Sequence, residues 1–359
     1  MSWQTEQQKS LTNVYEIKKQ FPKYNIETQT NFNVKITPHY LSLIDKKNPD
    51  DVLAKIVFPS KKELNIKKEE LDDPIGDKAK NKDLDNSPVK NLTHRYDDRV
   101  LIYMGNICSS YCRYCFRKNL LTHKPITTKE IEDIISYIKK HKEIREVIFT
   151  GGDPLMNSDT VIFTTLQKIE KIPHIKSIRI HTRMPIYNPY RITNDFIKEI
   201  KKLQKPLTII IHAVHERELS DITKDKLKRL QSAGVILLNQ APLLKGINDT
   251  VELQTALNYR LLECGVLPHY LHYLDLAKGT SHFRVPFRDA QKLMSDMRGR
   301  ISGHLIPKLI IDIPNGYGKV QIAEDYIKRI YKKGSYTFVD MESPVIKGKI
   351  LKYKEVLDK

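Results

Sequence analysis

Short apolar runs alternate with amphipathic segments between residues 99 and 275. The apolar runs have the length and the β-branched composition of buried strands, and they are RVLIYMG, REVIFT, SIRIHT, LTIIIH, VILLNQ and HYLHYLD. The segments between them predict helices over residues 127–144 and around 159–170, 193–204, 222–232 and 251–263. Strands that alternate with helices predict a parallel sheet with helices packed outside it.

The helix expected over residues 127–144 shows the pattern most clearly. Thr127 and Glu130 have the spacing of a capping box, which predicts where the helix begins. Its buried face is predicted by four isoleucines at helical spacing, Ile131, Ile134, Ile135 and Ile138.

Six β-α units follow from this pattern, and they fit either an open doubly wound sheet or a partial barrel. Polar residues collect where the predicted strands end, namely Asp153, His181, Arg183, His212, Gln240 and Asp275. Because α/β folds place their sites at the carboxyl ends of strands, this edge is the expected site. A further strand, KLIID, and a glycine-containing turn follow the last unit.

The flanking regions divide the chain into three expected parts. Residues 1–95 predict a helical N-terminal region, and within it the very polar residues 61–91 predict a short helix followed by a long exposed connector. Residues 96–325 are expected to form the core. Residues 326–359 are expected to form a short, partly strand-like C-terminal extension.

Composition adds limits on location and partners. The chain of 359 residues has no apolar run of about 18 residues, so no membrane-spanning helix is expected. Its N-terminus lacks the apolar core of a secretory signal, and four cysteines are too few for a disulfide framework, so we expect a cytoplasmic protein. The net charge of +18 would suit a polyanion partner such as RNA or an acidic protein, but the basic residues are spread along the chain, which favours compositional drift.

Three of the four cysteines, Cys108, Cys112 and Cys115, fall within eight residues directly after a predicted strand. Three thiolates on one loop can bind three irons of a four-iron cluster and leave the fourth iron open to a small molecule. A zinc site with His123 or Cys264 as the fourth ligand is the alternative, but no second cysteine hook accompanies the first.

The C-x3-C-x2-C spacing, with the aromatic Tyr114 before the third cysteine, resembles the motif of the radical S-adenosylmethionine enzymes. That resemblance implies a [4Fe-4S] cluster whose open iron binds S-adenosylmethionine and cleaves it to a 5′-deoxyadenosyl radical. FTGGDPL resembles the family segment that binds the amino end of S-adenosylmethionine. Gly151 and Gly152 would then allow close backbone approach, and Asp153 would accept from the ammonium group.

Longer stretches resemble the lysine 2,3-aminomutase family over about residues 70–325. They are LDDPIGD, THRYDDRVLIYMGNICSSYCRYCFRK, IFTGGDPL, LLNQAPLLKGIND, LDLAKGTSHFRVP and IIDIPNGYGK. The resemblance implies a partial (βα)6 radical S-adenosylmethionine barrel, pyridoxal 5′-phosphate as an additional cofactor, and an isomerase that moves the amino group of L-lysine from the α to the β carbon.

The same resemblance implies roles for four residues at the reacting centre. Lys319 matches the family's Schiff-base lysine for pyridoxal phosphate. Arg117 matches the arginine that binds the substrate carboxylate, and a planar bidentate donor suits that task. Asp275 and Asp312 match the two carboxylates that bind the side-chain ammonium of lysine, which selects for a cationic substrate.

Further cofactor contacts follow from the resemblance alone. Arg95, Tyr96 and Arg99 match residues that contact pyridoxal phosphate, with the two arginines on its phosphate. Arg183 and Gln240, at predicted strand ends, match contacts to S-adenosylmethionine.

Several alternatives remain open at the level of sequence. Shorter family members make (R)-β-lysine for elongation factor P, and residues alone do not separate that role from free-lysine metabolism. A reducing electron donor such as flavodoxin or ferredoxin is implied. Longer members carry a cysteine-rich zinc site that links subunits, and because no cysteine follows Lys319, a homo-oligomer would lack it. An RNA-modifying radical enzyme and a zinc-dependent nucleic-acid binder are the competing functions.

Overall fold

The computed structural model describes residues 2–78, 85–118, 125–322, 326–334, 336–342 and 348–354. Most of these residues surround one sheet of nine strands, and a smaller three-stranded sheet lies near the C-terminus. Within the described residues, no helix is both long enough and apolar enough to cross a membrane.

The nine strands of the large sheet follow one another in chain order. They are β1 (Leu92–Tyr96), β2 (Arg99–Tyr103), β3 (Glu146–Thr150), β4 (Ser177–Thr182), β5 (Leu207–Ile211), β6 (Ile236–Pro242), β7 (Leu267–His272), β8 (Lys308–Asp312) and β9 (Lys319–Gln321). Strands β2 to β8 are parallel, whereas β1 and β9 pair antiparallel at the two edges. In a doubly wound sheet, the order of the strands reverses at a switch point. The strands here follow chain order without such a reversal, so the sheet is a partial barrel and the open-sheet alternative is excluded.

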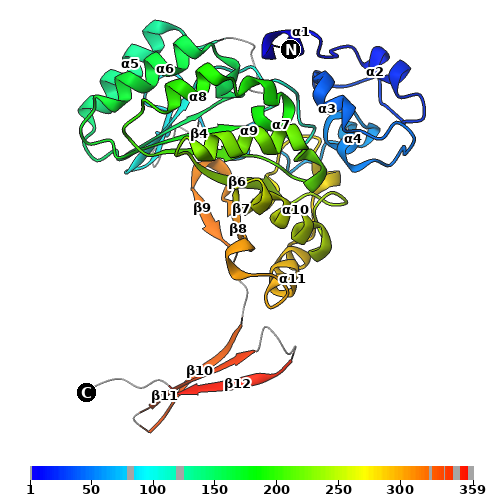
Figure 1. Ribbon diagram of the computed structural model, residues 1–359. Helices are drawn as coiled ribbons and strands as arrows, with labels where there is room; N and C mark the ends of the chain where they lie inside the picture. The colour runs from blue at the N-terminus through cyan, green and yellow to red at the C-terminus, as the bar shows by residue number, and fades with distance from the viewer. Residues whose placement is uncertain are drawn as a thin grey trace.

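Within the described residues, seven α-helices lie between the parallel strands, and Figure 1 shows helices covering the outer face of the curled sheet. They are α5 (Thr128–Lys140), α6 (Asp159–Glu170), α7 (Met184–Tyr187), α8 (Asn194–Ile200), α9 (Asp221–Ser232), α10 (Val251–Glu263) and α11 (Phe287–Met297). The predicted capping box of Thr127 and Glu130 is formed at the start of α5, and the four predicted isoleucines are buried. The predicted partial (βα)6 barrel is therefore confirmed.

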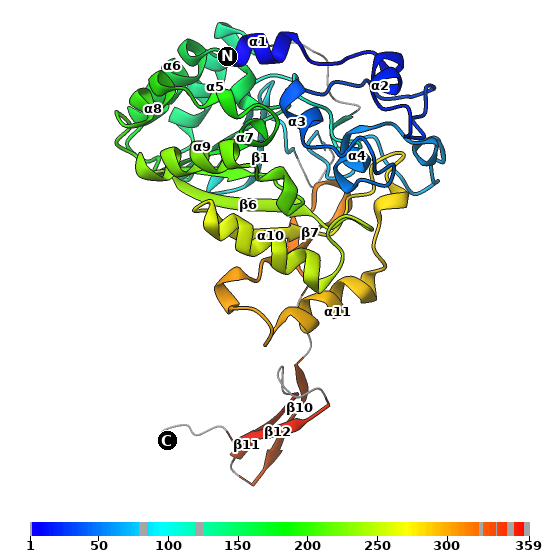
Figure 2. The ribbon, with the colours of Figure 1, turned by 45° about the vertical axis from the view of Figure 1, so that its right-hand side comes forward.

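The N-terminal region contains short helices that pack against the segments following β2, β4 and β5 (Figures 1 and 2). These are α1 (Trp3–Gln8), α2 (Val14–Gln20), α3 (Pro38–Ser42), α4 (Val52–Val57) and the 3-10 helix η1 (Lys61–Leu64). Backbone carbonyls of this region hold the loop that carries the cysteines, because Tyr111 N donates to Lys35 O at 2.9 Å and Arg113 N donates to Ile56 O at 2.8 Å. The buried Arg113 side chain also pairs with Glu63.

The prediction of a long exposed connector over residues 61–91 holds only in part. Residues 64–69 are exposed, but Glu70, Asp77 and Asn86 are buried, and Leu71 forms a bridge with Ala277. Because a buried charged or amide group needs partners, these residues anchor the polar segment to the rest of the protein, and it is not a solvated linker throughout. Strand β1 also runs across the boundary that the sequence places at residue 95.

The three strands near the C-terminus form a separate antiparallel sheet, as the strand-like pattern of the extension predicts. They are β10 (Ile327–Lys333), β11 (Tyr336–Glu342) and β12 (Ile350–Lys354), paired in chain order. Figures 1 and 2 both show this sheet apart from the barrel, on the side of α11.

Candidate active site

A cavity of about 440 Å³ lies at the carboxyl ends of the parallel strands. Its walls come from strands β1 to β4 and β6 to β8, from His212 directly after β5, from the first residue of β9, and from the cysteine loop that follows β2. This volume is within the range of small-molecule sites. Every residue given a role in the sequence analysis lines the cavity except Asp153.

Cys108, Cys112 and Cys115 all line one end of the cavity. Burial raises the pKa of the Cys115 thiol to about 11, and the nearby Cys112 adds to the effect. Burial and the other two cysteines likewise raise the pKa of Cys108. Thiols whose ionisation is opposed by burial, as at Cys108 and Cys115, suit a polynuclear cation, because metal binding deprotonates its thiol ligands.

The thiols do not form a site for one ion. Among the described residues, no three His, Cys, Asp or Glu side chains are grouped so that they could hold a metal ion. A [4Fe-4S] cluster binds each cysteine through a different iron, so its ligands need no common point. Of the alternative zinc ligands, Cys264 is buried at the end of α10 and does not line the cavity, and His123 lies outside the described residues.

The GGD turn after β3, residues 151–153, holds the cysteine loop through backbone hydrogen bonds. Gly152 N donates to Gly105 O and Asp153 N donates to Ile107 O, both at 2.8 Å. A Cβ atom at Gly151 would lie 2.4 Å from the Gly105 oxygen, and one at Gly152 would lie 2.5 Å from the Ile107 oxygen. The two glycines therefore allow the turn to touch the loop, and both also line the cavity.

Asp153 has a different place from the one predicted. Its buried carboxylate accepts from the Thr182 hydroxyl at 2.7 Å, from Arg183 N at 2.8 Å and from Leu155 N at 3.0 Å. It lies outside the cavity lining, so the predicted contact with an ammonium group has no support in this geometry. The carboxylate instead fixes the end of β4 to the turn after β3.

Lys319 and Asp312 face each other across the β8–β9 pair, in which they are direct partners. Their Nζ and Oδ1 atoms are 2.6 Å apart. The tight connection between the two strands contains left-handed residues, including Asn315 and Gly318 with φ of 66° and 93°. Gly318 also lets the chain pass close to Tyr96, whose hydroxyl accepts from Lys319 N at 2.8 Å.

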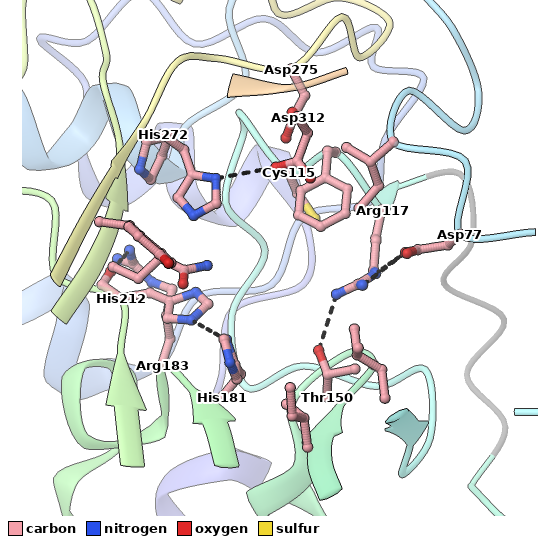
Figure 3. Close-up of a pocket in the computed structure, with 18 of the residues that line it drawn as sticks. Asp77, Cys115, Arg117, Thr150, His181, Arg183, His212, His272, Asp275 and Asp312 are labelled. Carbon is pink, nitrogen blue, oxygen red and sulfur yellow. Dashed lines mark hydrogen bonds and ion pairs between the residues drawn. The ribbon is translucent and has the colours of Figure 1, made fainter. Parts of the chain in front are cut away.

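Asp312 has a second partner in His272, whose Nδ1 lies 3.4 Å from Oδ2 (Figure 3). Burial alone would raise the pKa of Asp312, but the hydrogen bond from His272 and the charge of Lys319 outweigh burial and lower it to about 2. Burial lowers the pKa of His272, so this histidine is neutral and can donate. Asp312 is therefore a permanent anion at neutral pH.

Asp275 lies in the same cavity without a comparable partner. Among the described residues, none donates a hydrogen bond to its carboxylate, and Arg284 donates to its backbone carbonyl instead, at 2.9 Å. Burial and the nearby charge of Asp312 raise the pKa of Asp275 to about 7. A cation in the cavity would relieve both effects, so this carboxylate is suited to bind one.

Asp77 joins two of the predicted arginines. Arg117 donates to its Oδ2 from Nη2 at 2.7 Å and from Nε at 3.0 Å, while Arg95 donates to Oδ1 from Nη2 at 3.3 Å (Figure 3 shows the Arg117 pair). The remaining terminal nitrogen of Arg117, Nη1, donates to the Thr150 hydroxyl at 3.1 Å. Asp77 is a site residue that the sequence reasoning missed, although it lies in the quoted LDDPIGD motif.

The remaining predicted residues of the β1 side lie together. The guanidinium of Arg99 stacks 3.9 Å from the centre of the Tyr96 ring and pairs with Asp98 at 2.6 Å. Arg95 donates to Ile75 O at 2.8 Å. This edge therefore presents two arginines and one phenol to the cavity, a donor set that suits a phosphate.

On the opposite wall, Arg183 is buried and paired with Glu218 at 2.5 Å. Gln240 lines the same wall from β6. His181 and His212 also lie there and hydrogen-bond to each other at 3.3 Å (Figure 3). Burial and the charge of Arg183 lower the pKa of His212 to about 3, and burial lowers that of His181 well below its ordinary value, so both rings are neutral.

Several buried polar atoms of the lining lack a hydrogen-bond partner within the described part of the chain. They are Arg95 Nε, Arg183 Nε and His272 Nε2. Buried donors and acceptors are normally satisfied, so these atoms indicate that the cavity is built around polar ligands. Because these atoms lie on different walls of the cavity, the cavity can hold more than one ligand group.

Known proteins match the chain over most of its length. Residues 102–253 match the Radical SAM superfamily. L-lysine 2,3-aminomutase from Acetoanaerobium sticklandii is 34% identical over 333 residues, covering 90% of this chain and 79% of the relative. The enzyme of the same name from Clostridium subterminale is also 34% identical, covering 90% and 78%. The one from Methanococcus maripaludis is 38% identical over 299 residues, covering 82% and 67%.

These matches agree with the cysteine loop, the half-barrel and the charged cavity. The chain belongs to the lysine 2,3-aminomutase family of radical S-adenosylmethionine enzymes, and it is an isomerase that uses a [4Fe-4S] cluster and S-adenosylmethionine.

Proposed function

We propose that this protein converts L-lysine to β-lysine by 2,3-migration of the amino group, with pyridoxal 5′-phosphate as its second cofactor. The observation that carries the proposal is the unpaired carboxylate of Asp275 in a cavity that also contains Arg117. Lysine carries a carboxylate and a distant side-chain ammonium, and the cavity offers a group of opposite charge for each.

The side-chain ammonium is proposed to bind between Asp275 and Asp312. Asp312 is already anionic, and a bound ammonium would favour the ionised form of Asp275 as well. A neutral or acidic side chain would leave two buried carboxylates uncompensated, so the pair selects against such substrates.

The substrate carboxylate is proposed to bind Arg117. Asp77 holds the Nε and Nη2 side of this guanidinium, and the neutral Thr150 hydroxyl accepts at Nη1. A carboxylate that replaces or joins the hydroxyl at Nη1 would form a stronger, charge-assisted bond. Asp77 and Thr150 thus fix the orientation of the clamp before substrate arrives.

Pyridoxal phosphate is proposed to lie between Lys319 and the β1 edge, where Arg95 and Arg99 would bind its phosphate and Tyr96 would contact it. When bound, the cofactor supplies a conjugated ring that delocalises the unpaired electron of the rearranging substrate. Asp312 holds the Lys319 amine in the cavity, and the Tyr96 hydroxyl fixes the backbone of the same residue. Lys319 can therefore release the cofactor to a substrate amine and remain nearby for its return.

The radical is proposed to arise at the other end of the cavity. Cys108, Cys112 and Cys115 would bind three irons, while Gly151, Gly152, Arg183 and Gln240 would line the pocket for S-adenosylmethionine. The electron is proposed to come from a flavodoxin- or ferredoxin-like donor. Closure of the cavity around its ligands would keep water from the radical.

The three expected parts of the chain can be assigned tasks on the same basis. Residues 1–95 support the cysteine loop and supply Asp77 and Arg95, residues 96–325 supply the barrel, and residues 326–359 add the small sheet. We place the reaction in the cytoplasm, where reduced thiols and reductants for an iron-sulfur cluster are available.

The decisive experiment is anaerobic reconstitution of the full chain with iron, sulfide and pyridoxal phosphate. Incubation with S-adenosylmethionine, dithionite and L-lysine should give β-lysine, detected by chromatography and mass spectrometry. Lys319→Ala should abolish product formation but retain the cluster. A protein with a cluster that binds no pyridoxal phosphate and leaves lysine unchanged would overturn the proposal.

The product could serve free-lysine metabolism or the β-lysylation of elongation factor P. The same reconstituted protein can show whether the substrate is free L-lysine or lysine already attached to elongation factor P. Turnover of free L-lysine, together with no turnover of lysine already attached to elongation factor P, supports the production of free β-lysine as the step catalysed here. The reverse result contradicts it.

A further inference from the structure

The hydroxyl of Tyr187 lies 3.0 Å from the sulfur of Cys112. We infer that Tyr187 donates a hydrogen bond to the Cys112 thiolate and thereby raises the reduction potential of the iron-sulfur cluster. This inference goes beyond the proposed aminomutase reaction and rests on its assignment of Cys112 as an iron ligand.

Tyr187 is held so that its hydroxyl has little freedom to point elsewhere. It is the last residue of the short helix α7, which directly follows β4, and it is 1% exposed. Its ring packs edge-on against Tyr40 with ring centres 4.9 Å apart, and the Arg183 guanidinium lies 4.5 Å from the ring centre. Its backbone carbonyl accepts from the Thr37 hydroxyl.

The direction of the hydrogen bond follows from the state of the sulfur. An iron-bound cysteine is a thiolate and has no proton, whereas a phenol with an ordinary pKa near 10 keeps its proton at neutral pH. The phenol must therefore be the donor. The neighbouring Tyr114 hydroxyl accepts from Arg183 at 2.6 Å and also lies within hydrogen-bonding range of Cys112, so Tyr114→Phe is a second variant for the test.

A donor at this sulfur acts on the redox equilibrium of the cluster. One-electron reduction adds negative charge to the iron and sulfur atoms, and a hydrogen bond to a ligand sulfur stabilises the more negative state. The bond is therefore stronger in the reduced cluster, and the midpoint potential rises. The electron itself comes from the external reductant, and Tyr187 undergoes no covalent change.

The consequence for the reaction is that the reductant needs less driving force to charge the cluster. Tyr187 does not touch the substrate, so it is a positioning residue that acts through Cys112. Its removal should change the potential without changing the position of Arg117 or Asp275.

The test compares Tyr187→Phe with Tyr40→Phe, both in the full chain reconstituted with iron and sulfide. Each change removes one buried phenol hydroxyl, but the Tyr40 hydroxyl donates to Glu218 at 2.7 Å and not to a sulfur. Iron and sulfide content is measured first, and the reduced fraction is then followed by electron paramagnetic resonance during a redox titration.

At a fixed applied potential, we expect the ratio of reduced to oxidised cluster to fall several-fold in Tyr187→Phe and to stay near the wild-type ratio in Tyr40→Phe. A tenfold change in this ratio corresponds to about 59 mV for a one-electron couple. An unchanged ratio in a fully loaded Tyr187→Phe protein would overturn the inference. A wild-type protein that binds no cluster would instead contradict the proposed function.

If Tyr187→Phe does not retain the cluster, the wild-type protein still tests the contact. A hydrogen bond from an exchangeable hydroxyl should make a terminal iron–sulfur stretching band in the resonance Raman spectrum shift on transfer to D2O. A band that still shifts in Tyr114→Phe supports the inference, and a spectrum in which no such band moves contradicts it.

Discussion

Asp275 and Asp312 face the same cavity, yet their pKa values are moved in opposite directions. The hydrogen bond from His272 and the charge of Lys319 stabilise the Asp312 carboxylate and lower its pKa to about 2. Burial and the proximity of Asp312 raise the pKa of Asp275 to about 7. The structure thus combines one carboxylate that is always charged with one whose charge depends on pH and on what the cavity contains.

Lysine binding should therefore weaken in acid. Below pH 7 the free Asp275 carboxyl is mostly protonated, and an arriving ammonium must displace that proton, so the apparent Kd should rise about tenfold for each pH unit below 7. Above pH 7 this effect should vanish. The charged groups that act on Asp275 are Asp312, Lys319, Asp77 and Arg117.

Isothermal titration of lysine into the protein between pH 5.5 and 8.5, in about half-unit steps, measures this dependence. Asp275→Asn should bind lysine weakly at every pH, with little slope. An equally steep slope in the variant would assign the titration to another group.

Asp312→Asn should lower kcat/KM for lysine by about 100-fold or more, equivalent to about 2.7 kcal/mol. The change removes both the counter-charge of Lys319 and one of the two proposed ammonium partners. Steady-state kinetics with lysine measures the loss, and the visible spectrum checks that the cluster is retained. Asp289→Asn, on the exposed first turn of α11, is the control and should leave kcat/KM unchanged.

Asp77→Asn should destabilise the ligand-free protein by about 3 kcal/mol. Breaking a buried pair leaves an uncompensated charge, and Asp77 is shared by Arg117 and Arg95. Asp72→Asn is a matched control, because Asp72 pairs with Lys278 at the surface, where a pair contributes at most about 1 kcal/mol. Denaturant unfolding measures the loss in free energy of unfolding for both variants. An equal loss in the two would contradict the assignment.

Gly152→Ala should reduce cluster loading. The added Cβ would lie 2.5 Å from the Ile107 oxygen, so the cysteine loop would have to move away from the turn. Gly303→Ala is the control, because its Cβ would have nothing within 4 Å. Iron and sulfide analysis after identical reconstitution measures the difference, and equal loading would show that the loop tolerates the shift.

The regular part of the fold could be predicted because its signals are local. Helix α10 and strand β8 have the predicted bounds, since each depends on a periodic run bounded by turn residues. The cysteine spacing likewise indicates a cluster without any knowledge of the rest of the chain. Lys319 and Asp312 could be placed together only by resemblance, because a strand pair formed across a tight turn has no distinctive composition.

The parts that sequence reasoning missed depend on long-range partners. Asp77 lies in a segment as polar as a solvated linker, and its burial depends on two arginines that come from β1 and from the cysteine loop. Asp153 looked free for a ligand, but Thr182 and the backbone of Arg183 supply its donors. No pattern along the chain marks Tyr187, which meets Cys112 only in the folded protein.

The carbonyl groups of Lys35 and Ile56 that hold the cysteine loop also imply an order of events during synthesis. Both residues leave the ribosome before Cys108, Cys112 and Cys115, and domains tend to fold from the N-terminal end as they emerge. The GGD turn, which holds the same loop through the carbonyls of Gly105 and Ile107, is synthesised after the cysteines. The loop therefore takes its final shape from segments made both before and after its thiols.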